Sequence, residues 1–429
     1  MLCMAHTMHC GIDMQISRLA ACGAIMLAHA SAHAQSEPPS TQPAPTTEPA
    51  PATGPGPAAP AAPAAAAEAK KPDETKLTIG GYLEGYYQAH FQDPSNRITN
   101  LRGYDNRSRS FTLSSVAVDV KGEKGPVTGH IILQVGAAPS TVYLVEPVSP
   151  GTGSVNTSSG ELWKYLQTAM VTVKGPRDTT IEAGLFTSPV GIEVLPVKDN
   201  WNLSRSNLFF ALPAYHTGVR ISHPIADGWT GTLHLYNGWN TVVDNNGYPS
   251  IALSAGYSSA TTTAQLLYFG GIERSTGAPE GKPWRHLFDA LVQYAVTSEV
   301  SVAAHADAGF EPNDIGTSSW ASAAVYGKLA LSDKLYTAVR GDTFYESVPT
   351  SSGATASAIF WPTKWVAEAT ATLAYQPVDG VSIRLEYRHD QADSDVFFGG
   401  SLSGDGVTAP YVFNRKSQDT ATLGATAWF

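Results

Sequence analysis

The charged stretch RLEYRHD, residues 384–390, alternates basic and acidic side chains at every second position. Arg384, Glu386, Arg388 and Asp390 share one parity, so in an extended strand all four side chains point to the same face. Two chemistries fit such a stripe. The opposite charges pair with one another, or they line a water-filled space and select ions by charge. Both interpretations place a polar face on a β-strand, and pairing is the favoured one for this stripe.

Charged residues also occupy the polar phase of other predicted strands. These eight are Glu84, Glu182, Arg220, Asp289, Asp307, Arg340, Asp342 and Glu368. Together with the stripe they make eight acids and four arginines, a net charge of −4. Because fixed charges set ion selectivity in wide pores, this count predicts a mild cation preference. The alternative is that the charges pair across strands and only keep an interior polar.

Metal binding and catalysis find less support in the sequence. Asp390, Asp393 and Asp395 carry the oxygen ligands that Ca²⁺ prefers, but the spacing lacks the glycine and the closing glutamate of a calcium loop. A solvated acidic loop is therefore favoured. A Ser–His–acid hydrolase is conceivable, yet no G-x-S-x-G nucleophile turn stands at the end of a predicted strand. We expect no metal, no cofactor and no enzyme activity.

The composition bounds the class of protein. The chain has 429 residues, of which 43% are apolar and only 15% are charged, a low share for a soluble protein. The net charge of −10 argues against a nucleic-acid partner. After the N-terminal region no apolar run approaches the roughly 18 residues of a membrane helix.

Residues 1–34 have the features of a secretory signal peptide. Arg18 supplies the positive charge, residues 19–30 are apolar, and Ala32-His33-Ala34 forms a cleavage site. Met1 and Met14 are the two alternatives for the initiating residue. A lipoprotein box ending at Cys22 is the rival interpretation, but too few apolar residues precede that cysteine. Since all three cysteines lie before residue 34, the mature chain would contain no thiol or disulfide.

Residues 35–75 differ sharply from the rest of the chain. They hold eleven of the 29 prolines and no aromatic residue. Such a segment cannot bury a core, so we expect a disordered linker, partly in polyproline II conformation. A plain spacer is the favoured role, and a periplasmic tether to the cell wall or to a partner is the alternative.

From residue 76 onward the sequence alternates apolar and polar residues in segment after segment, which predicts β-strands. The sixteen predicted strands are 77–91, 109–120, 127–136, 163–173, 179–186, 215–223, 229–236, 251–257, 262–270, 286–295, 301–310, 320–330, 334–345, 365–375, 381–390 and 417–429. In the second of them the alternation slips at Ser114-Ser115, which indicates a β-bulge.

The lengths of the connections decide the fold class. Seven connections are short and rich in Gly, Pro and Asp, as tight turns require. They alternate with eight long loops: 92–108, 137–162, 187–214, 237–250, 271–285, 311–319, 346–364 and 391–416. Long loops on one side and short turns on the other describe an all-β, up-and-down transmembrane barrel of about 16 strands, spanning residues 76–429. A barrel of this size leaves a lumen.

The last predicted strand fits the wall of such a barrel. Its apolar face carries small residues and ends on Phe429, so it suits lipid better than a soluble core. A C-terminal Phe on such a strand resembles the signal read by the outer-membrane assembly machinery. All nine tryptophans lie after residue 76, as expected for aromatic girdles at the membrane interfaces.

Several strings resemble the putative beta-barrel porin family of Gram-negative bacteria (OmpL-like). They are GLFTSPVGIEV (184–194), NWNLSRSNLF (200–209), YHTGVRISHPI (215–225), NGWN (237–240) and RLEYRHD (384–390). The resemblance runs from about Gly80 to Phe429 and leaves out the proline-rich segment. It implies an outer-membrane pore, and it implies no particular substrate and no catalytic residues.

The third long loop, 187–214, is the predicted constriction of the pore, because the third loop of general porins, which this chain resembles, folds inward. The predicted constriction residues are Glu193, Lys198, Asp199, Asn200, Trp201, Ser204 and Arg205. An aromatic patch at 208–210 would pack against the barrel wall. Arg205 is expected to project into the channel or to pair with Glu84 or Asp342, since a guanidinium stays charged at any working pH. Packing against the wall without contacting solute is the alternative for the loop.

The sequence thus predicts an outer-membrane porin, a passive channel for small hydrophilic solutes or ions, with its N-terminal segment in the periplasm. The alternative is a plugged barrel that anchors the envelope or presents surface loops. Expected partners are outer-membrane lipid and lipopolysaccharide and the barrel assembly machinery. A homotrimer is a candidate assembly by analogy alone.

Overall fold

A computed structural model describes residues 74–149 and 157–429. The predicted signal peptide and all but the last two residues of the predicted linker lie outside these ranges, so both stay predictions. In the described part of the chain, no helix is long and apolar enough to cross a membrane.

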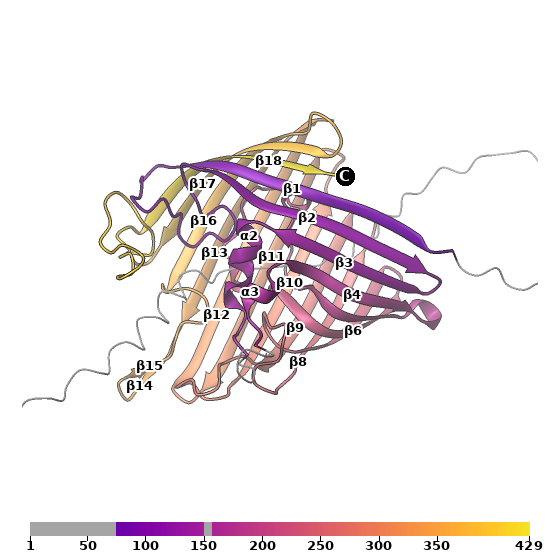
Figure 1. The fold of residues 1–429 in the computed structure, drawn as a ribbon, viewed down its shortest axis with the longest axis horizontal. Coiled ribbons are helices and arrows are strands. Elements are labelled where there is room, and N and C mark those ends of the chain that lie inside the picture. The colour runs from indigo at the N-terminus through magenta and orange to yellow at the C-terminus, as the bar shows by residue number, and fades with distance from the viewer. Residues whose placement is uncertain (1–73, 150–156) are drawn as a thin grey trace, which may run out of the picture.

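The described residues form one closed antiparallel β-barrel (Figure 1). Its strands are β1 (Lys76–His90), β2 (Phe111–Lys124), β3 (Val127–Val135), β4 (Leu166–Lys174), β5 (Thr180–Thr187), β6 (Tyr215–Ala226), β7 (Trp229–Tyr236), β8 (Ser250–Ser258), β9 (Thr262–Ile272), β10 (Trp284–Ala295), β11 (Val300–Asn313), β12 (Gly316–Ser332), β13 (Leu335–Ser347), β16 (Trp365–Tyr375), β17 (Val381–Ala392) and β18 (Ser417–Trp428). Each strand pairs with its neighbours in sequence, and β18 closes the barrel against β1. The predicted fold class is confirmed, and each of the sixteen predicted strands corresponds to one of these.

Alternation along each strand separates the inner face of the barrel from the outer one. In β17 the outward side chains of Ile383 and Leu385 are 41% and 55% exposed, whereas Arg384 and Glu386 between them are almost fully buried inside. Side chains on a strand point to opposite faces in turn, so the period-2 pattern of the sequence becomes a lipid-type outer face and a polar inner face.

The irregularity predicted at Ser114-Ser115 is present. Glu84 of β1 lies opposite Ser115, and the next residue, Gly85, lies opposite Leu113. Ser114 is therefore an extra residue on β2, which is the definition of a β-bulge.

Long and short connections gather at opposite ends of the barrel, as predicted, with one exception. The segment 311–319 was predicted to be a long loop, but β11 continues to Asn313 and β12 begins at Gly316, leaving a two-residue turn. The prediction was wrong because Glu311 and Ser318 continue the inner polar phase of their strands, and polar residues there were taken for a loop.

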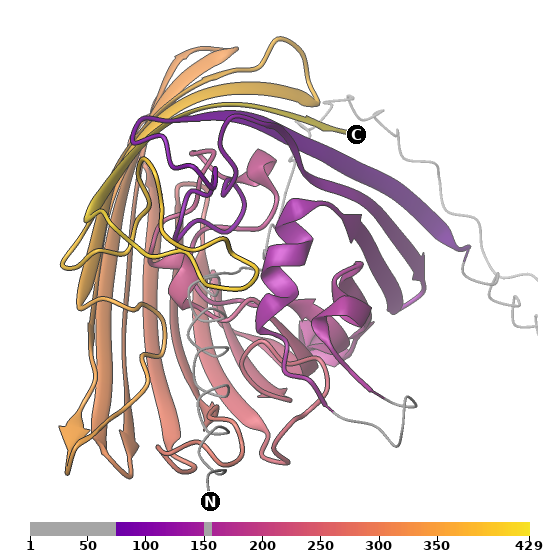
Figure 2. The ribbon, with the colours of Figure 1, turned by 60° about the vertical axis from the view of Figure 1, so that its left-hand side comes forward.

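Short elements occupy three of the long loops and one of the short turns. The second loop holds α2 (Ala137–Val142), η1 (Tyr143–Val145) and α3 (Gly160–Trp163), which takes up the start of the strand predicted from residue 163. The third loop holds η3 (Val197–Asp199) and η4 (Phe209–Ala211), and the seventh holds the hairpin β14 (Thr350–Ser351) and β15 (Ala354–Thr355). The turn between β4 and β5 is η2 (Pro176–Asp178). Figure 2 shows the first, second and eighth loops gathered at the same end of the barrel.

Candidate pore site

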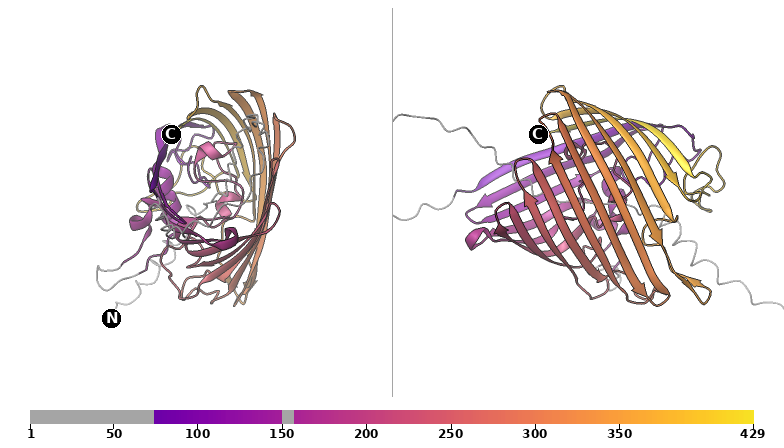
Figure 3. Two further views of the ribbon diagram at one scale, coloured as in Figure 1. Left: turned by 90° about the vertical axis from the view of Figure 1, so that its right-hand side faces the viewer. Right: turned by 180° about the vertical axis from the view of Figure 1, so that it is seen from behind.

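The third loop, residues 188–214, leaves β5 and crosses the interior of the barrel before it returns to β6 (Figure 3, left). It reaches the opposite wall at β1, where the backbone N–H of Val197 donates to Glu84 at 2.5 Å. It also reaches β18, where a Cβ on Gly424 would lie 2.0 Å from Leu203 Cδ1. Only a glycine at this position lets the loop approach the wall so closely.

Carboxylates of the wall accept hydrogen bonds from the backbone of the loop. Besides Glu84, Glu386 of β17 accepts from the N–H of Leu203 at 2.6 Å and of Ser204 at 2.9 Å. Asp342 of β13 accepts from the N–H of Asn207 at 2.6 Å. A loop inside a barrel has no sheet partner for its backbone groups, so the wall must supply one.

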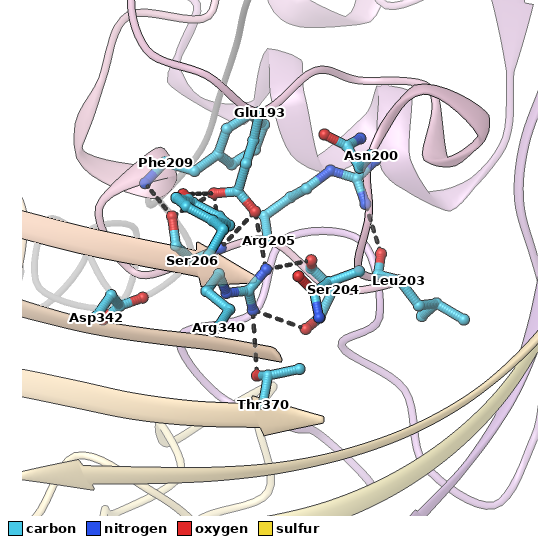
Figure 4. A network of polar contacts seen from close by, with 12 residues as sticks. Glu193, Asn200, Leu203, Ser204, Arg205, Ser206, Phe209, Arg340, Asp342 and Thr370 are labelled. Atoms are coloured by element: carbon cyan, nitrogen blue, oxygen red, sulfur yellow. Dashed lines mark hydrogen bonds and ion pairs between the residues drawn. The ribbon is translucent and has the colours of Figure 1, made fainter. Parts of the chain in front are cut away.

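Arginines of the wall donate to the same loop. Arg384 donates to the carbonyls of Val197 at 2.8 Å and of Asn202 at 3.0 Å. Arg340 donates to the carbonyl of Ser204 at 2.7 Å and pairs with Glu193 at 2.8 Å (Figure 4). Arg388 donates to the carbonyl of Arg205. The wall thus binds both the donors and the acceptors of the loop backbone.

The charged stripe of β17 pairs only in part. Arg388 and Asp390 form an ion pair at 2.6 Å, as the pairing interpretation expected. Arg384 and Glu386, by contrast, bind the third loop rather than each other. Arg340 of β13 forms a further ion pair with Glu368 of β16 at 2.8 Å, which links these two strands to the same set of polar contacts.

Arg205 neither projects into the channel nor forms an ion pair with Glu84 or Asp342, so both expectations for it were wrong. Its side chain is buried, with 1% of the residue exposed, and its guanidinium donates to the carbonyls of Val194, Leu203 and Leu195 within the same loop (Figure 4). It also lies over the ring of Tyr104, 5.1 Å from the centroid. We had expected water or a carboxylate to satisfy this guanidinium, but three carbonyls of a tight loop do so equally well.

The other predicted constriction residues separate into buried and accessible ones. Glu193, Asn200 and Ser204 are buried in the loop and hold it together; Asn200, for example, donates to the carbonyl of Val194 at 2.7 Å. Lys198 and Asp199 form a pair at 2.9 Å with side chains 28% and 32% exposed. Trp201 is half-buried. Of the predicted constriction residues, only Lys198, Asp199 and Trp201 keep accessible side chains that can face the part of the lumen that the loop does not fill.

Six of the predicted lumen charges have no hydrogen bond to the third loop: Glu368 and Asp390, which pair with Arg340 and Arg388 as described above, and Glu182, Arg220, Asp289 and Asp307. Glu182 pairs with Arg220 across β5 and β6. Asp289 pairs with His305 at 2.5 Å, and Asp307 accepts from the hydroxyl of Ser322 at 2.6 Å. All twelve predicted lumen charges therefore have a partner within the protein.

Three charged residues just beyond the predicted strand ends of the inner wall escaped the sequence reasoning. Arg285 and Glu311 form an ion pair at 2.8 Å, and Glu346 accepts from the backbone N–H groups of Phe360 and Trp361 in the seventh loop at 3.1 and 3.0 Å. Each lies one residue beyond a predicted strand boundary. Because strand ends are the least certain part of a pattern, extending each polar phase by one residue would have found them.

An apolar core fills part of the interior near the long loops, and the sequence predicted only one part of it, the packing of the aromatic patch at 208–210. Phe209 and Phe210 of the third loop pack on Tyr104 of the first, with centroids 6.0 and 5.9 Å away. Tyr143 of the second loop stacks on Tyr215 at 4.4 Å. The interior therefore differs from the uniformly polar lumen that the strand phases implied.

Buried carboxylates also tie the long loops to one another. Glu146 of the second loop accepts from the hydroxyl of Tyr215 at 2.6 Å and from the N–H of Val242 in the fourth loop at 3.0 Å. Burial raises the pKa of Glu146 to about 7, although these hydrogen bonds oppose the shift. Burial also raises the pKa of Glu273 in the fifth loop, which accepts from the N–H of Trp239 at 2.8 Å.

The described residues contain no group of three or more His, Cys, Asp or Glu side chains placed to hold a metal ion. Asp390 pairs with Arg388 and with Arg102 at 3.2 Å, while Asp393 and Asp395 are exposed. The three aspartates considered for Ca²⁺ are thus divided between the wall and a surface loop.

The family follows from the sequence itself. A model of the family described as "Putative beta-barrel porin-2, OmpL-like" matches residues 76–429. The chain belongs to this family. The match covers the whole barrel from the first residue of β1 and confirms the resemblance and the prediction of a porin. No curated protein matches the chain in sequence.

Solved structures share the fold of this OmpL-like porin at low sequence identity. The outer membrane channel DcaP of Acinetobacter baumannii is 12% identical, with a TM-score of 0.55, and the match covers 83% of this chain and 97% of that one. An anion-selective porin from Comamonas acidovorans (10% identity, TM-score 0.53) and OmpT of Vibrio cholerae in its trimer form (10%, 0.54) each match over 83% of this chain and 100% of theirs. At such identities the likeness concerns the fold alone.

Proposed function

We propose that this porin is a passive outer-membrane channel for small hydrophilic solutes or ions, and that its third loop narrows the lumen. The observation that carries the proposal is the attachment of that loop to the wall opposite its own strands, through Glu84, Asp342 and Glu386. A loop held there reduces the open cross-section, and we expect water to pass along the polar parts of the wall that the loop does not cover, on β2, β3, β6 and β7.

The polar residues of that wall support such a path. Asp119 and His130 pair at 2.8 Å with side chains 41% and 20% exposed, and Ser222 and Thr232 share a hydrogen bond at 3.0 Å. Since the charges of the wall are paired, the count of −4 overstates the field that an ion would meet. We therefore expect weak ion selectivity, set mainly by Lys198 and Asp199 on the accessible side of the loop.

The test is conductance in a planar bilayer. The refolded protein should give stepwise currents, and Asp199→Lys should move the reversal potential under a salt gradient toward anions. Asp227→Lys is the matched control, because Asp227 lies in the short turn between β6 and β7, outside the lumen. Equal shifts in both variants would mean that the third loop does not border the path.

The plugged barrel is the second candidate, and the apolar core formed by the loops favours it. Phe360 and Trp361 of the seventh loop pack on Phe344 of the wall at 5.6 and 6.2 Å, inside the barrel. A barrel that inserts into the bilayer, resists heat denaturation and yet gives no current would support this candidate over the channel.

The setting of the protein follows from the same proposal. We place the short turns and the N-terminal segment in the periplasm and the long loops outside, in contact with lipopolysaccharide. A homotrimer is supported by the trimer form of OmpT, and Phe429 is the candidate signal for the barrel assembly machinery. We expect no enzyme activity, since the charged side chains of the interior are engaged with one another and with the loop backbone.

A further inference from the structure

A small niche lies between the third loop and the wall of the barrel. It is lined by Asp199, Trp201 and Asn202 of the loop and by Gln293 of β10, and its volume is about 30 Å³. A space of this size accepts a water molecule, so it also has room for a hydroxyl group of a ligand.

Asn202, one of the residues that line this niche, carries an unsatisfied acceptor. Its residue is 2% exposed, its amide nitrogen donates to the hydroxyl of Thr372 at 2.8 Å, and its Oδ1 has no hydrogen-bond partner. The orientation of the amide is fixed, because the Thr372 hydroxyl itself donates to Glu386 at 2.7 Å and can therefore only accept from Asn202. A buried acceptor without a donor is unfavourable, and a hydroxyl group would satisfy it.

Trp201 stands beside this acceptor and is half-buried. Its position is held by the hydroxyl of Tyr336, which donates to the Trp201 carbonyl at 3.1 Å. An indole combines a large apolar face with a polar edge, so it suits a ligand that has both an apolar face and hydroxyl groups. Gln293, exposed on the facing wall, adds an amide that can donate and accept.

We propose that Trp201, Asn202 and Gln293 form a subsite for neutral, hydroxyl-rich solutes, of the class of sugars and polyols. The C–H face of the solute lies on Trp201, and one hydroxyl enters the niche and donates to Oδ1 of Asn202. The proposal rests on the proposed channel function, because it places the subsite on the constriction. Because the charges of the wall are paired, the electric field in the lumen is weak, and this agrees with a neutral rather than a charged ligand.

The first measurement is calorimetric titration of the refolded full chain in detergent with sucrose, which requires no conduction. The control ligand is bis(2-methoxyethyl) ether, which accepts hydrogen bonds but cannot donate them. Sucrose should bind and the ether should not. Asn202→Leu and Trp201→Ala should each weaken sucrose binding about tenfold, the change expected when one buried hydrogen bond or one aromatic contact is lost.

Two further variants guard against misfolding. Gln293→Leu changes an exposed side chain of the wall and should weaken binding severalfold without affecting the barrel. Trp284→Ala removes a tryptophan from the outer face, which is 37% exposed, and should leave binding unchanged. In a bilayer, sucrose should lower the single-channel current of the parent more than that of Asn202→Leu.

Several outcomes would overturn the subsite. They are equal binding of sucrose and the ether, binding by Asn202→Leu at parental strength, and no binding of sucrose at all, which would mean that the niche holds only water. Sucrose binding without any stepwise current would reject the channel and keep the subsite. Stepwise currents without sucrose binding would reject the subsite and keep the channel.

Discussion

Arg340 is the residue whose loss should release the third loop most directly. Its side chain is fully buried, and it joins Glu368 of the wall, Glu193 of the loop and the carbonyl of Ser204 at 2.8, 2.8 and 2.7 Å. Arg340→Met keeps the volume but leaves the buried carboxylate of Glu193 without a cation, while Glu368 keeps only the longer contact with Arg388 at 3.7 Å. Breaking a buried ion pair in this way costs about 3–5 kcal/mol. We expect the cost to fall on the attachment of the loop, because the backbone ladder of the strands is unchanged.

A change of about 3–5 kcal/mol moves the equilibrium between attached and released loop by roughly two to three and a half powers of ten. In a bilayer, Arg340→Met should therefore show a larger mean conductance and more current noise than the parent. In detergent, a protease should cut within 188–214 while the barrel stays resistant.

The matched control is Arg220→Met. Arg220 also pairs with a carboxylate on the inner wall, Glu182, but it has no hydrogen bond to the third loop. The Arg220→Met variant should show the same protease cleavage pattern as the parent. If Arg340→Met and the parent share conductance, noise and cleavage pattern, the ion pairs of Arg340 do not hold the loop and the account of the constriction fails.

Three other predictions concern the loops and the N-terminal segment. Gly424→Ala should push Leu203 away from β18, at a cost of about 1–3 kcal/mol as in other overpacked sites, and so raise conductance; unchanged current would contradict this contact. The carboxyl of Glu146 has a pKa of about 7, above its ordinary value, so its contribution to holding the second loop is complete below about pH 4.5 and declines as the pH rises toward 7, by up to about 3 kcal/mol. The protection factors of that loop's amides, which are corrected for the intrinsic pH dependence of exchange, should fall over this range in the parent and stay constant in Glu146→Gln, and constant protection in the parent would refute the assignment. A chain that starts at Lys76 should refold in detergent with the same strand content by circular dichroism, whereas failure would give the segment before it a structural role.

The barrel could be predicted because its signal repeats. Sixteen segments with period-2 alternation, divided by long loops and short turns, gave the strand count, the bulge at Ser114 and the inner face that carries Arg340 and Glu386. The one false loop, 311–319, shows where the signal weakens, since polar residues that continue an inner strand face are the same types that fill loops.

The interior could be predicted only in part, because contacts between distant segments leave no periodic trace. The position of the third loop was inferred by resemblance, and its aromatic patch did pack inside. The partners of Arg205 could not be foreseen, since they are carbonyls whose directions depend on the turns of that loop. The same holds for the apolar core, in which Tyr104, Tyr143 and Phe360 come from three different loops.

The attachment of the third loop also bears on how the barrel resists opening. The sheet is closed by the pairing of β1 with β18, which runs over only nine residue pairs, from Tyr82 to His90. The loop bonds Glu84 on one side of this seam and packs Leu203 onto Gly424 on the other. Separation of the two strands would therefore require the loop to detach from one of them, so that the element proposed to narrow the lumen also adds to the barrier against opening of the seam and lengthens the lifetime of the closed barrel.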